Sequence, residues 1–209
     1  MIRLKINNKE YELPTSFDDI TLEDYCRIFR KLTDTDKIED DREKYIAIKK
    51  NEATIISRLF KERDDFCLDM PLPLFDKLSK LCNFIYGIDK FKRKNEIVID
   101  GKKYKVGEVN KFSTRKWIDI DITTKDSDDD LYIQLLAILL DEVQEDGKLK
   151  VYDGNYQKLM PKLSKMKCSD ALPIVYYFFW KGASSRKIMM ACSAMQEIMN
   201  RFAPHTTNS

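Results

Sequence analysis

Two stretches of this chain repeat one pattern: RLKINNKEYEL at residues 3–13 and EIVIDGKKYKV at residues 96–106. Apolar and charged residues alternate on either side of a central pair, which is Asn-Asn at 7–8 and Asp-Gly at 100–101. Such pairs tolerate the positive φ angles of a two-residue turn, and the alternation is typical of a strand with one buried face. Each stretch therefore predicts a β-hairpin.

The turn positions also predict which residues face each other across the two strands. The first hairpin should have one apolar face and, behind it, the ion pairs Arg3–Glu12 and Lys5–Glu10. Its apolar face would carry Ile2, Leu4, Ile6, Tyr11 and Leu13. The second hairpin should have the apolar face Ile97, Ile99, Tyr104 and Val106, backed by the ion pair Glu96–Lys105.

The similarity continues into the segment after each hairpin. Thr21 and Ser113 are each suited to cap a helix, and each is followed four positions later by an aromatic residue. Asp24 would complete a capping box in the first segment, whereas Lys116 stands in its place in the second. Residues 117–122 fit a short helix or a third strand. We interpret the whole echo as an internal duplication; independent convergence of two common hairpins is the alternative.

The rest of the chain has the periodicity and the punctuation of helices. We predict helices over residues 41–60, 71–87, 128–143 and 169–182, and a last helix capped by Ser184 or Ser185. Inward positions of the first of these would be Tyr45, Ile48, Ile55 and Leu59, and the helix at 128–143 is apolar on nearly every side, so it should be central.

The predicted fold class is therefore α+β and mostly helical, with two similar hairpins at about 2–13 and 96–106, each followed by helices. We expect a single domain over residues 1–209, with a division into two pseudo-repeat lobes, 1–92 and 93–209, as the alternative.

Composition narrows the class of protein. Apolar residues make up 43% and charged residues 34%, which is typical of a soluble globular protein with a heavily charged surface. The five cysteines are odd in number and include no CxxC pair, so neither a disulfide framework nor a zinc site is predicted. The apolar runs at 131–140 and 174–180 are too short to span a membrane, and the N-terminus lacks the apolar core of a signal peptide. We expect a cytosolic site of synthesis and no membrane partner.

No familiar catalytic or metal-binding pattern is complete. Residues 119–130 resemble a calcium loop, but Thr124 stands where that loop needs glycine and Asp130 where it needs glutamate. An acidic turn that caps the next helix is the simpler interpretation. The single histidine, His205, lies near the C-terminus, so no Ser-His or Cys-His pair is predicted. We expect a protein that is not an enzyme, with no catalytic, cofactor-binding or metal-binding residues.

One hairpin nevertheless offers the residue types of a nuclease site, namely Glu96, Asp100 and Lys102. Basic residues also gather around it and again near 158–167, and such a strip could touch phosphates. They are Lys90, Lys92, Arg93, Lys94, Lys102, Lys103, Lys105, Lys158, Lys162, Lys165 and Lys167. Because the formal net charge is only +2, nucleic acid is not expected as the main partner.

The strongest sign of a protein interface is a group of aromatic and methionine residues near the C-terminus, since both types are enriched in interface cores. A buried core helix is the alternative for its aromatic members. The candidate interface residues are Tyr176, Phe179, Trp180, Met189, Met190, Met195 and Met199.

These motifs together resemble small proteins of tailed bacteriophages, particularly of the crAss-like type with AT-rich genomes. The similarity is carried by Ile6-Asn7-Asn8-Lys9 with Tyr11, by Ile99-Asp100-Gly101-Lys102 with Tyr104, by the step from Phe112-Ser113 into Trp117-Ile118-Asp119, and by the close at Phe178-Phe179-Trp180-Lys181-Gly182. An acidic break before an apolar helix and a composition rich in Lys, Asp, Ile and Asn agree with it.

The resemblance implies a non-enzymatic virion or assembly protein: a tail, neck or internal component, or an assembly chaperone. It implies no catalytic residues and no cofactor. Its partners would be other phage structural proteins, or further copies of itself, in the virion or in the host cytoplasm during assembly. The alternative function is that of a phage DNA-binding or nuclease-like accessory protein that uses the basic strip near 90–105.

Overall fold

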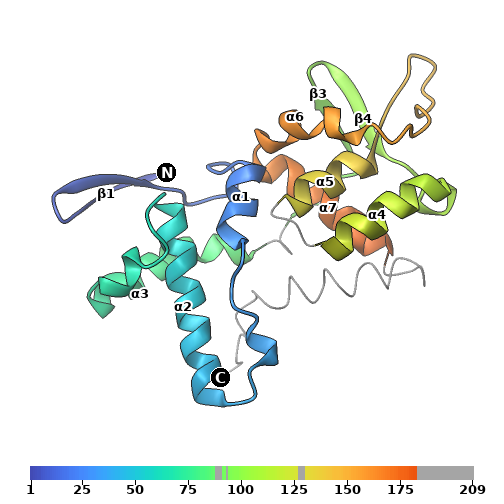
Figure 1. Cartoon of the computed structure of the whole chain (residues 1–209). Helices are drawn as coiled ribbons and strands as arrows, with labels where there is room; N and C mark the ends of the chain where they lie inside the picture. The colour runs from blue at the N-terminus through green and yellow to red at the C-terminus, as the bar shows by residue number, and fades with distance from the viewer. Residues whose placement is uncertain (88–90, 93, 127–129, 183–209) are drawn as a thin grey trace.

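The computed structural model describes residues 1–87, 91–92, 94–126 and 130–182 (Figure 1). The helices are α1 (Leu22–Phe29), α2 (Asp41–Leu59), α3 (Leu72–Cys82), α4 (Thr114–Asp126), α5 (Leu131–Leu139), α6 (Met160–Ser164) and α7 (Cys168–Gly182). The strands are β1 (Ile2–Ile6), β2 (Lys9–Leu13), β3 (Glu96–Ile99), β4 (Lys102–Val106) and β5 (Leu140–Glu142). The chain is α+β and mostly helical, which confirms the predicted fold class.

Strands β1 and β2 form the first hairpin with the predicted register, in which Leu4 lies opposite Tyr11. Both turn residues have positive φ, 49° at Asn7 and 64° at Asn8, as a type I′ turn requires. The apolar face is buried at Ile6, Tyr11 and Leu13, and it packs on the end of α2 and the turn that follows, where the rings of Tyr11 and Phe60 meet edge to face at 5.2 Å. The hairpin depends on this cover, because two strands alone are marginally stable.

Strands β3 and β4 form the second hairpin, also in the predicted register, with Ile97 opposite Tyr104. Its turn residues have φ angles of 50° at Asp100 and 77° at Gly101. Here the sheet has a third strand: β5 pairs antiparallel with β4 and places Asp141 opposite Lys105. We call the first hairpin with α1 the first unit and the second hairpin with α4 the second unit.

The ion pairs behind the apolar faces are predicted less well than the register. Arg3 and Glu12 pair as expected, with Nε and Oε1 3.2 Å apart. Among the described residues Lys5 and Glu10 form no ion pair, and Glu96 pairs with Lys103 at 2.9 Å instead of with Lys105. Long exposed side chains reach diagonal neighbours on a sheet as easily as direct ones, so register alone does not choose the partner.

The predicted helix at 128–143 is wrong at its C-terminal end. Helix α5 stops at Leu139, and the next three residues form β5. The apolar run is continuous, but the backbone around Asp141 finds hydrogen-bond partners on the open edge of β4, and this tertiary pairing overrides local helix preference. The central position of the helix is confirmed: every residue of α5 except Gln134 is buried, and α1, α4, α6 and α7 surround it.

Each unit continues from its hairpin into a helix that begins at a hydroxyl cap. Thr21 and Asp24 form the predicted capping box of α1. Ser113 accepts a hydrogen bond from the Lys116 amide at 3.2 Å, and α4 follows, so residues 117–122 are helical rather than a strand. The acidic segment that begins at Asp119 therefore lies in a helix up to Asp126, and the prediction of an acidic turn is wrong for that part.

Helix α2 has the predicted length, but its predicted inward face is only half buried. Ile55 and Leu59 are 2% and 3% exposed, whereas Tyr45 and Ile48 are 62% and 36% exposed. The reason is geometric: the first half of α2 projects beyond the other helices (Figure 1). The inward assignment of Tyr45 and Ile48 is therefore wrong, although the periodicity that suggested it is real.

The first unit is tied to the last third of the chain by backbone pairing. The Leu22 amide donates to the Met166 carbonyl at 2.8 Å, and the Cys168 amide donates to the Ile20 carbonyl at 3.0 Å. These bonds join the start of α1 to the start of α7, so segments far apart in sequence share one backbone network.

Asp19 organises the connection between the first hairpin and α1. Its carboxylate accepts hydrogen bonds from the backbone amides of Thr15 at 2.9 Å and Ser16 at 3.2 Å, and from the N-terminal ammonium at 3.0 Å. The Thr15 amide and that ammonium lower the pKa of Asp19 from 3.8 to about 2.

Replacing Asp19 with asparagine should therefore cost stability only at higher pH. Because the folded pKa lies below the unfolded one, the contribution is complete above pH 3.8 and is lost as the pH falls toward 2. We expect Asp19→Asn to lower the free energy of unfolding by about 1–2 kcal/mol at pH 6 and to converge on the wild type near pH 2. Urea unfolding across this range is the measurement, with the exposed Asp69→Asn as control; a deficit that does not change with pH would contradict the argument.

Two further observations concern the length of the helices and the state of the cysteines. None of the helices in the described part of the chain is both long and apolar enough to span a bilayer. Cys26, Cys67, Cys82 and Cys168 are free and buried, while Cys192 lies outside the described residues. Burial raises the pKa of Cys26 and Cys82 to about 12, so these thiols stay protonated and unreactive.

Candidate functional site

The predicted aromatic and methionine interface falls mostly outside the described residues. Tyr176 lies in α7 and is half buried. The backbone of Phe179 and Trp180 belongs to α7, but their side chains are not described. The methionines are not described at all: Met189, Met190, Met195 and Met199. This interface stays a prediction.

The structure does not bring Glu96, Asp100 and Lys102 together as a nuclease-like site. Each binds a different partner: Glu96 binds Lys103 at 2.9 Å, Asp100 binds Lys162 at 2.7 Å, and Lys102 binds Glu142 at 2.7 Å. Asp100 lies in the turn, and Glu96 lies at the other end of β3. Carboxylates engaged in this way do not converge on a common point where a metal ion or a phosphate could sit. Within the described ranges, no group of three His, Cys, Asp or Glu residues is placed to hold a metal ion.

The basic strip near residues 90–105 is largely neutralised by neighbouring acids. Besides Lys102 and Lys103, Lys94 binds Asp170 at 3.1 Å. Lys92 is exposed, whereas Lys90 and Arg93 lie outside the described residues. Opposite charges interleaved in this way weaken the long-range field that attracts nucleic acid.

The most unusual group in the molecule is Lys116, which is 1% exposed. It occupies the third residue of α4, the position at which the first unit carries the capping acid Asp24. Its Nζ donates to both carboxylate oxygens of Asp141 at 2.7 Å and to the Leu139 carbonyl at 3.2 Å. The three N–H bonds of the ammonium are thus all engaged, and they fasten α4 to β5.

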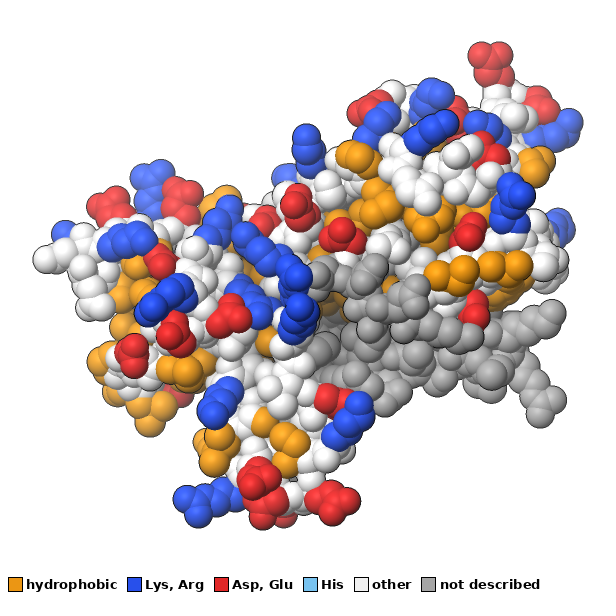
Figure 2. All heavy atoms as spheres, in the orientation of Figure 1, with side chains coloured by type: hydrophobic (Ala, Val, Ile, Leu, Met, Phe, Trp, Pro, Cys, Tyr) orange, Lys and Arg blue, Asp and Glu red, His pale blue; other side chains and the backbone are white. Residues whose placement is uncertain are grey.

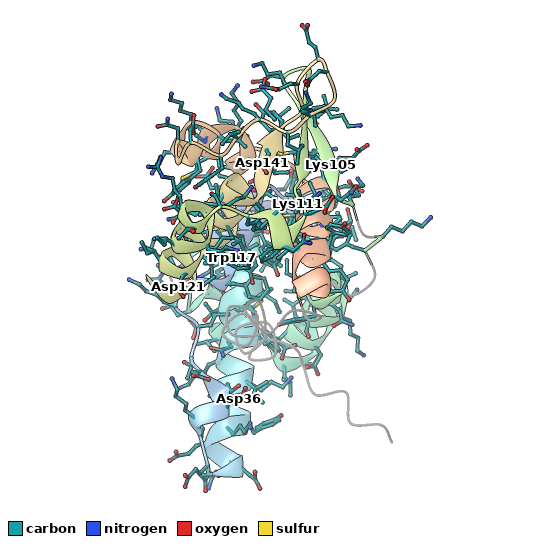
Figure 3. The ribbon with its side chains drawn as sticks, turned by 90° about the vertical axis from the view of Figure 1, so that its right-hand side faces the viewer. Asp36, Lys105, Lys111, Trp117, Asp121 and Asp141 are labelled. Carbon is teal, nitrogen blue, oxygen red and sulfur yellow. The ribbon has the colours of Figure 1, made fainter. Side chains whose placement is uncertain are left out.

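Aromatic rings cover the rest of the Lys116 ammonium. Its Nζ lies 4.6 Å from the ring centroid of Phe112 and 5.2 Å from that of Tyr152, within the range of cation–π attraction. The Tyr152 hydroxyl donates to Asp119 at 2.7 Å, which fixes the second ring against α4. Gly107 lies against the other side of Asp141, where an added Cβ would come within 3.1 Å of the carboxylate. Figure 3 shows Asp141 beside β4, which carries Lys105.

Burial and mutual attraction act in opposite directions on this ion pair. Loss of hydration lowers the pKa of Lys116 and raises the pKa of Asp141, while the attraction between the two opposes both shifts. The short contacts to both oxygens are those of an ammonium and a carboxylate. We therefore assign a structural role to the pair, since it holds the third strand in place and leaves the ammonium no free donor.

A surface cavity of about 240 Å³ lies next to this pair, and Asp141 and Tyr152 form part of its wall. Its other polar residues include Lys150, Lys158 and Asp153, which are exposed and of mixed charge. No single ligand chemistry follows from such a lining.

The second feature that could contact another molecule is the projecting half of α2. We define the α2 face as Tyr45 and Ile48, which are 62% and 36% exposed. Figure 2 shows apolar side chains on this projection, bordered by acidic and basic ones. Asp36, which Figure 3 labels, lies on the same projection.

Neither feature is predicted from the sequence, although each leaves a trace in it. The trace of the buried ion pair is Lys116 at a position where a capping box calls for an acid. The trace of the α2 face is an apolar stripe that continues through the whole helix, longer than the core that can cover it.

Comparisons of the chain with protein-family models, with curated protein sequences and with solved structures found no match.

Proposed function

We propose that this chain is a non-enzymatic structural or assembly protein that acts through protein–protein contacts, as the resemblance to small virion proteins of tailed phages implies. Its partners would be other structural proteins of the particle, or further copies of the chain. It would work in the virion, or in the host cytoplasm during assembly. The observation that carries the proposal is the exposed α2 face.

The α2 face continues a stripe that is part of the core elsewhere in the same helix. Tyr45 and Ile48 lie on the side of α2 that also carries Ile55 and Leu59, because helix positions separated by three, four or seven residues share a side. Ile55 and Leu59 are buried under neighbouring elements, but Tyr45 and Ile48 extend beyond them. An apolar stripe that begins in the core and continues onto the exposed surface is typical of a surface that becomes buried when the subunit joins an assembly.

The same projection is held in place by the segment that precedes α2. The Asn51 side chain accepts from the Thr33 amide at 3.0 Å and donates to the Thr33 carbonyl at 2.8 Å. Ala47, one turn before Asn51, is also buried. A helix end that is supported in this way can bind a partner with little loss of conformational entropy.

The chemistry of the described residues supports the same proposal. The carboxylates and lysines that could make a nuclease site are committed to separate ion pairs, and Lys116 has every hydrogen engaged. Those groups form ion pairs and hydrogen bonds that hold the structure together.

A photoreactive benzoyl-phenylalanine in place of Tyr45 tests the proposal most directly. In cells that produce the particle, we expect it to cross-link to a structural protein, because a 62% exposed aromatic at an interface centre lies within bond-forming reach of the partner. The same group in place of Val151, which is 84% exposed but outside the α2 face, is the matched control and should give no adduct. Equal labelling at both positions would contradict the assignment of the face.

The double variant Tyr45→Lys, Ile48→Lys gives the complementary measurement. It should fold normally, since both residues are exposed, and its incorporation into particles should fall roughly ten-fold or more. Mass spectrometry of finished particles then separates two roles, because a structural component stays in the particle and an assembly chaperone is found only in unfinished ones. Absence from both kinds of particle would remove the proposal.

A further inference from the structure

Helix α4 exposes two isoleucines on its outer side. Its inner side is buried at Lys116 and Ile120, which are 1% and 0% exposed. Ile118 and Ile122 are 53% and 51% exposed, and residues four positions apart lie one above the other on a helix. Single exposed apolar residues are ordinary, but two that are stacked in this way form a patch that another element can cover. We call Ile118 and Ile122 the α4 face.

The described chain ends close to this face. The ring of Phe178, near the end of α7, stacks on that of Phe112 with the ring centroids 6.4 Å apart. The Phe112 ring also lies 5.7 Å from that of Trp117, in the first turn of α4. Gly182 is one helical turn beyond Phe178, so the residues that follow it begin beside α4. A linker over residues 183–187 can extend roughly 16 Å, more than the roughly 10–12 Å diameter of a helix, and so it can reach any side of α4.

Residues 183–209 lie outside the described part of the chain, and their sequence predicts an amphipathic helix. Its apolar residues follow one another at spacings of four, three, four and three, as on one side of a helix. They are Ile188, Cys192, Met195, Met199 and Phe202, which we call the C-terminal stripe. The charged residues Arg186, Glu197 and Arg201 fall on the opposite side. So narrow a stripe is typical of a helix that packs on a single surface.

The C-terminal stripe and α4 match in length. From Ile188 to Phe202 a helix rises about 21 Å, and α4, with 13 residues, is about 20 Å long. Residues four positions apart, such as Ile118 and Ile122, form the kind of ridge that fits between the side chains of a facing helix.

Charge distinguishes the α4 face from the α2 face as the place where this helix packs. Residues 183–209 contain three basic residues and one acid. Residues 114–130 contain six acids and three basic residues, whereas residues 41–50, around the α2 face, contain two acids and four basic residues. These counts include both signs, so ion pairs within each segment do not change the balance. The C-terminal segment is therefore attracted to α4 and repelled from the α2 face.

The same balance disfavours the α4 face of a second copy as the occupant. Two such faces placed together would bring two acidic segments into contact, and like charges repel.

We infer that residues 186–202 dock on the α4 face of their own chain as an amphipathic helix, with the C-terminal stripe against Ile118 and Ile122. Docking removes both isoleucines and the stripe from water in one step, and the hydrophobic effect favours it. The contact lies within one chain and does not depend on the proposed role of the α2 face.

The inference divides the methionines of the predicted interface into two pairs. Met195 and Met199 belong to the C-terminal stripe, so they would pack inside the subunit. Met189 and Met190 lie off the stripe and would stay available to another subunit.

Disulfide formation in the full-length chain tests the docking, because Cys192 belongs to the stripe and the four other cysteines are buried. With Ile118→Cys or Ile122→Cys, oxidation by copper phenanthroline should link the new thiol to Cys192 within one chain at one or both positions. Mass spectrometry of the peptides and of the intact product identifies the link. Tyr45→Cys and Val151→Cys, at residues 62% and 84% exposed, are the matched controls. They should link to Cys192 at least roughly ten-fold less, since a disulfide forms only between neighbouring backbones.

Trypsin gives a second measurement that needs no new bond. Its sites in the segment are Arg186, Lys187 and Arg201, and a docked helix must detach before it is cut. Ile122→Asp should fold, since this side chain is half exposed, and should speed cleavage roughly ten-fold by placing a charge against the apolar stripe. The control is Val98→Asp, at a residue 63% exposed on β3, which should leave the cleavage rate unchanged.

Three outcomes would overturn the inference. The first is that neither Ile118→Cys nor Ile122→Cys links to Cys192 above the level of the controls. The second is a linked product with the mass of two chains, which would make a second copy the source of the segment. The third is equal cleavage of the wild type and of Ile122→Asp, because the α4 face would then not hold the segment.

Discussion

Replacing Lys116 with methionine should lower the free energy of unfolding by about 3 kcal/mol, because it leaves the Asp141 carboxylate buried without its cation. The side chains of Lys116 and Asp141 are only 2% and 11% exposed, so water does little to compensate the carboxylate. Urea unfolding monitored by circular dichroism at pH 7 is the measurement. The control is Lys111→Met, at a lysine whose side chain is 71% exposed, which should change stability by less than about 0.5 kcal/mol.

A second substitution separates two causes of this deficit: the lost attraction between the two charges, and the cost of burying the Asp141 carboxylate without a cation. The double variant Lys116→Met, Asp141→Leu should recover most of the loss, since a buried ion pair can be replaced by apolar residues of similar size at little cost. If the double variant is as unstable as the single one, the deficit comes from lost packing, and the charge argument fails.

The deficit of Lys116→Met should also depend on pH. Burial already raises the pKa of Asp141 above 3.8, and removing the ammonium takes away an influence that lowers it. A carboxyl with a raised folded pKa binds its proton more tightly in the folded state, so stability falls as pH rises through the interval above 3.8. The free energy of unfolding of the variant should therefore be closer to that of the wild type at about pH 4 than at about pH 7.

Replacing Leu136 with alanine should have an even larger effect, about 4 kcal/mol. Leu136 is fully buried in α5, and four other helices surround that helix. Walls fixed from several sides relax little into the cavity that the substitution creates, which places the cost in the upper part of the usual range for such changes. Thermal and urea unfolding both report it.

The matched control is Leu72→Ala, because Leu72 is 68% exposed at the start of α3. It should change the free energy of unfolding by less than about 0.5 kcal/mol. A cost below about 1 kcal/mol for Leu136→Ala would mean that α5 is not the centre of the core.

What could be predicted from the sequence is what depends on neighbours along the chain. The hairpin registers follow from alternation and from turn pairs that accept positive φ, and the structure places Leu4 opposite Tyr11 and Ile97 opposite Tyr104. The caps at Thr21 and Ser113 follow from side chains that satisfy the first amides of a helix.

What could not be predicted depends on elements far apart in sequence. Strand β5 has the composition of a helix, and only the open edge of β4 makes it a strand. The partner of Lys116 lies 25 positions away, beyond the reach of any local pattern. The exposure of Tyr45 depends on where the other helices end, which its own periodicity cannot reveal.

The backbone pairing between residues 20–22 and 166–168 constrains the order in which this chain can mature on the ribosome. Thr21 and Cys168, which also touch through the thiol and a carbonyl, are 147 positions apart. Closing so long a loop is slow, and it cannot begin until most of the polypeptide has been synthesised. During translation the first hairpin and α1 would remain without the residues that complete their interface. Surfaces left uncovered in this way are prone to aggregate unless chaperones bind them.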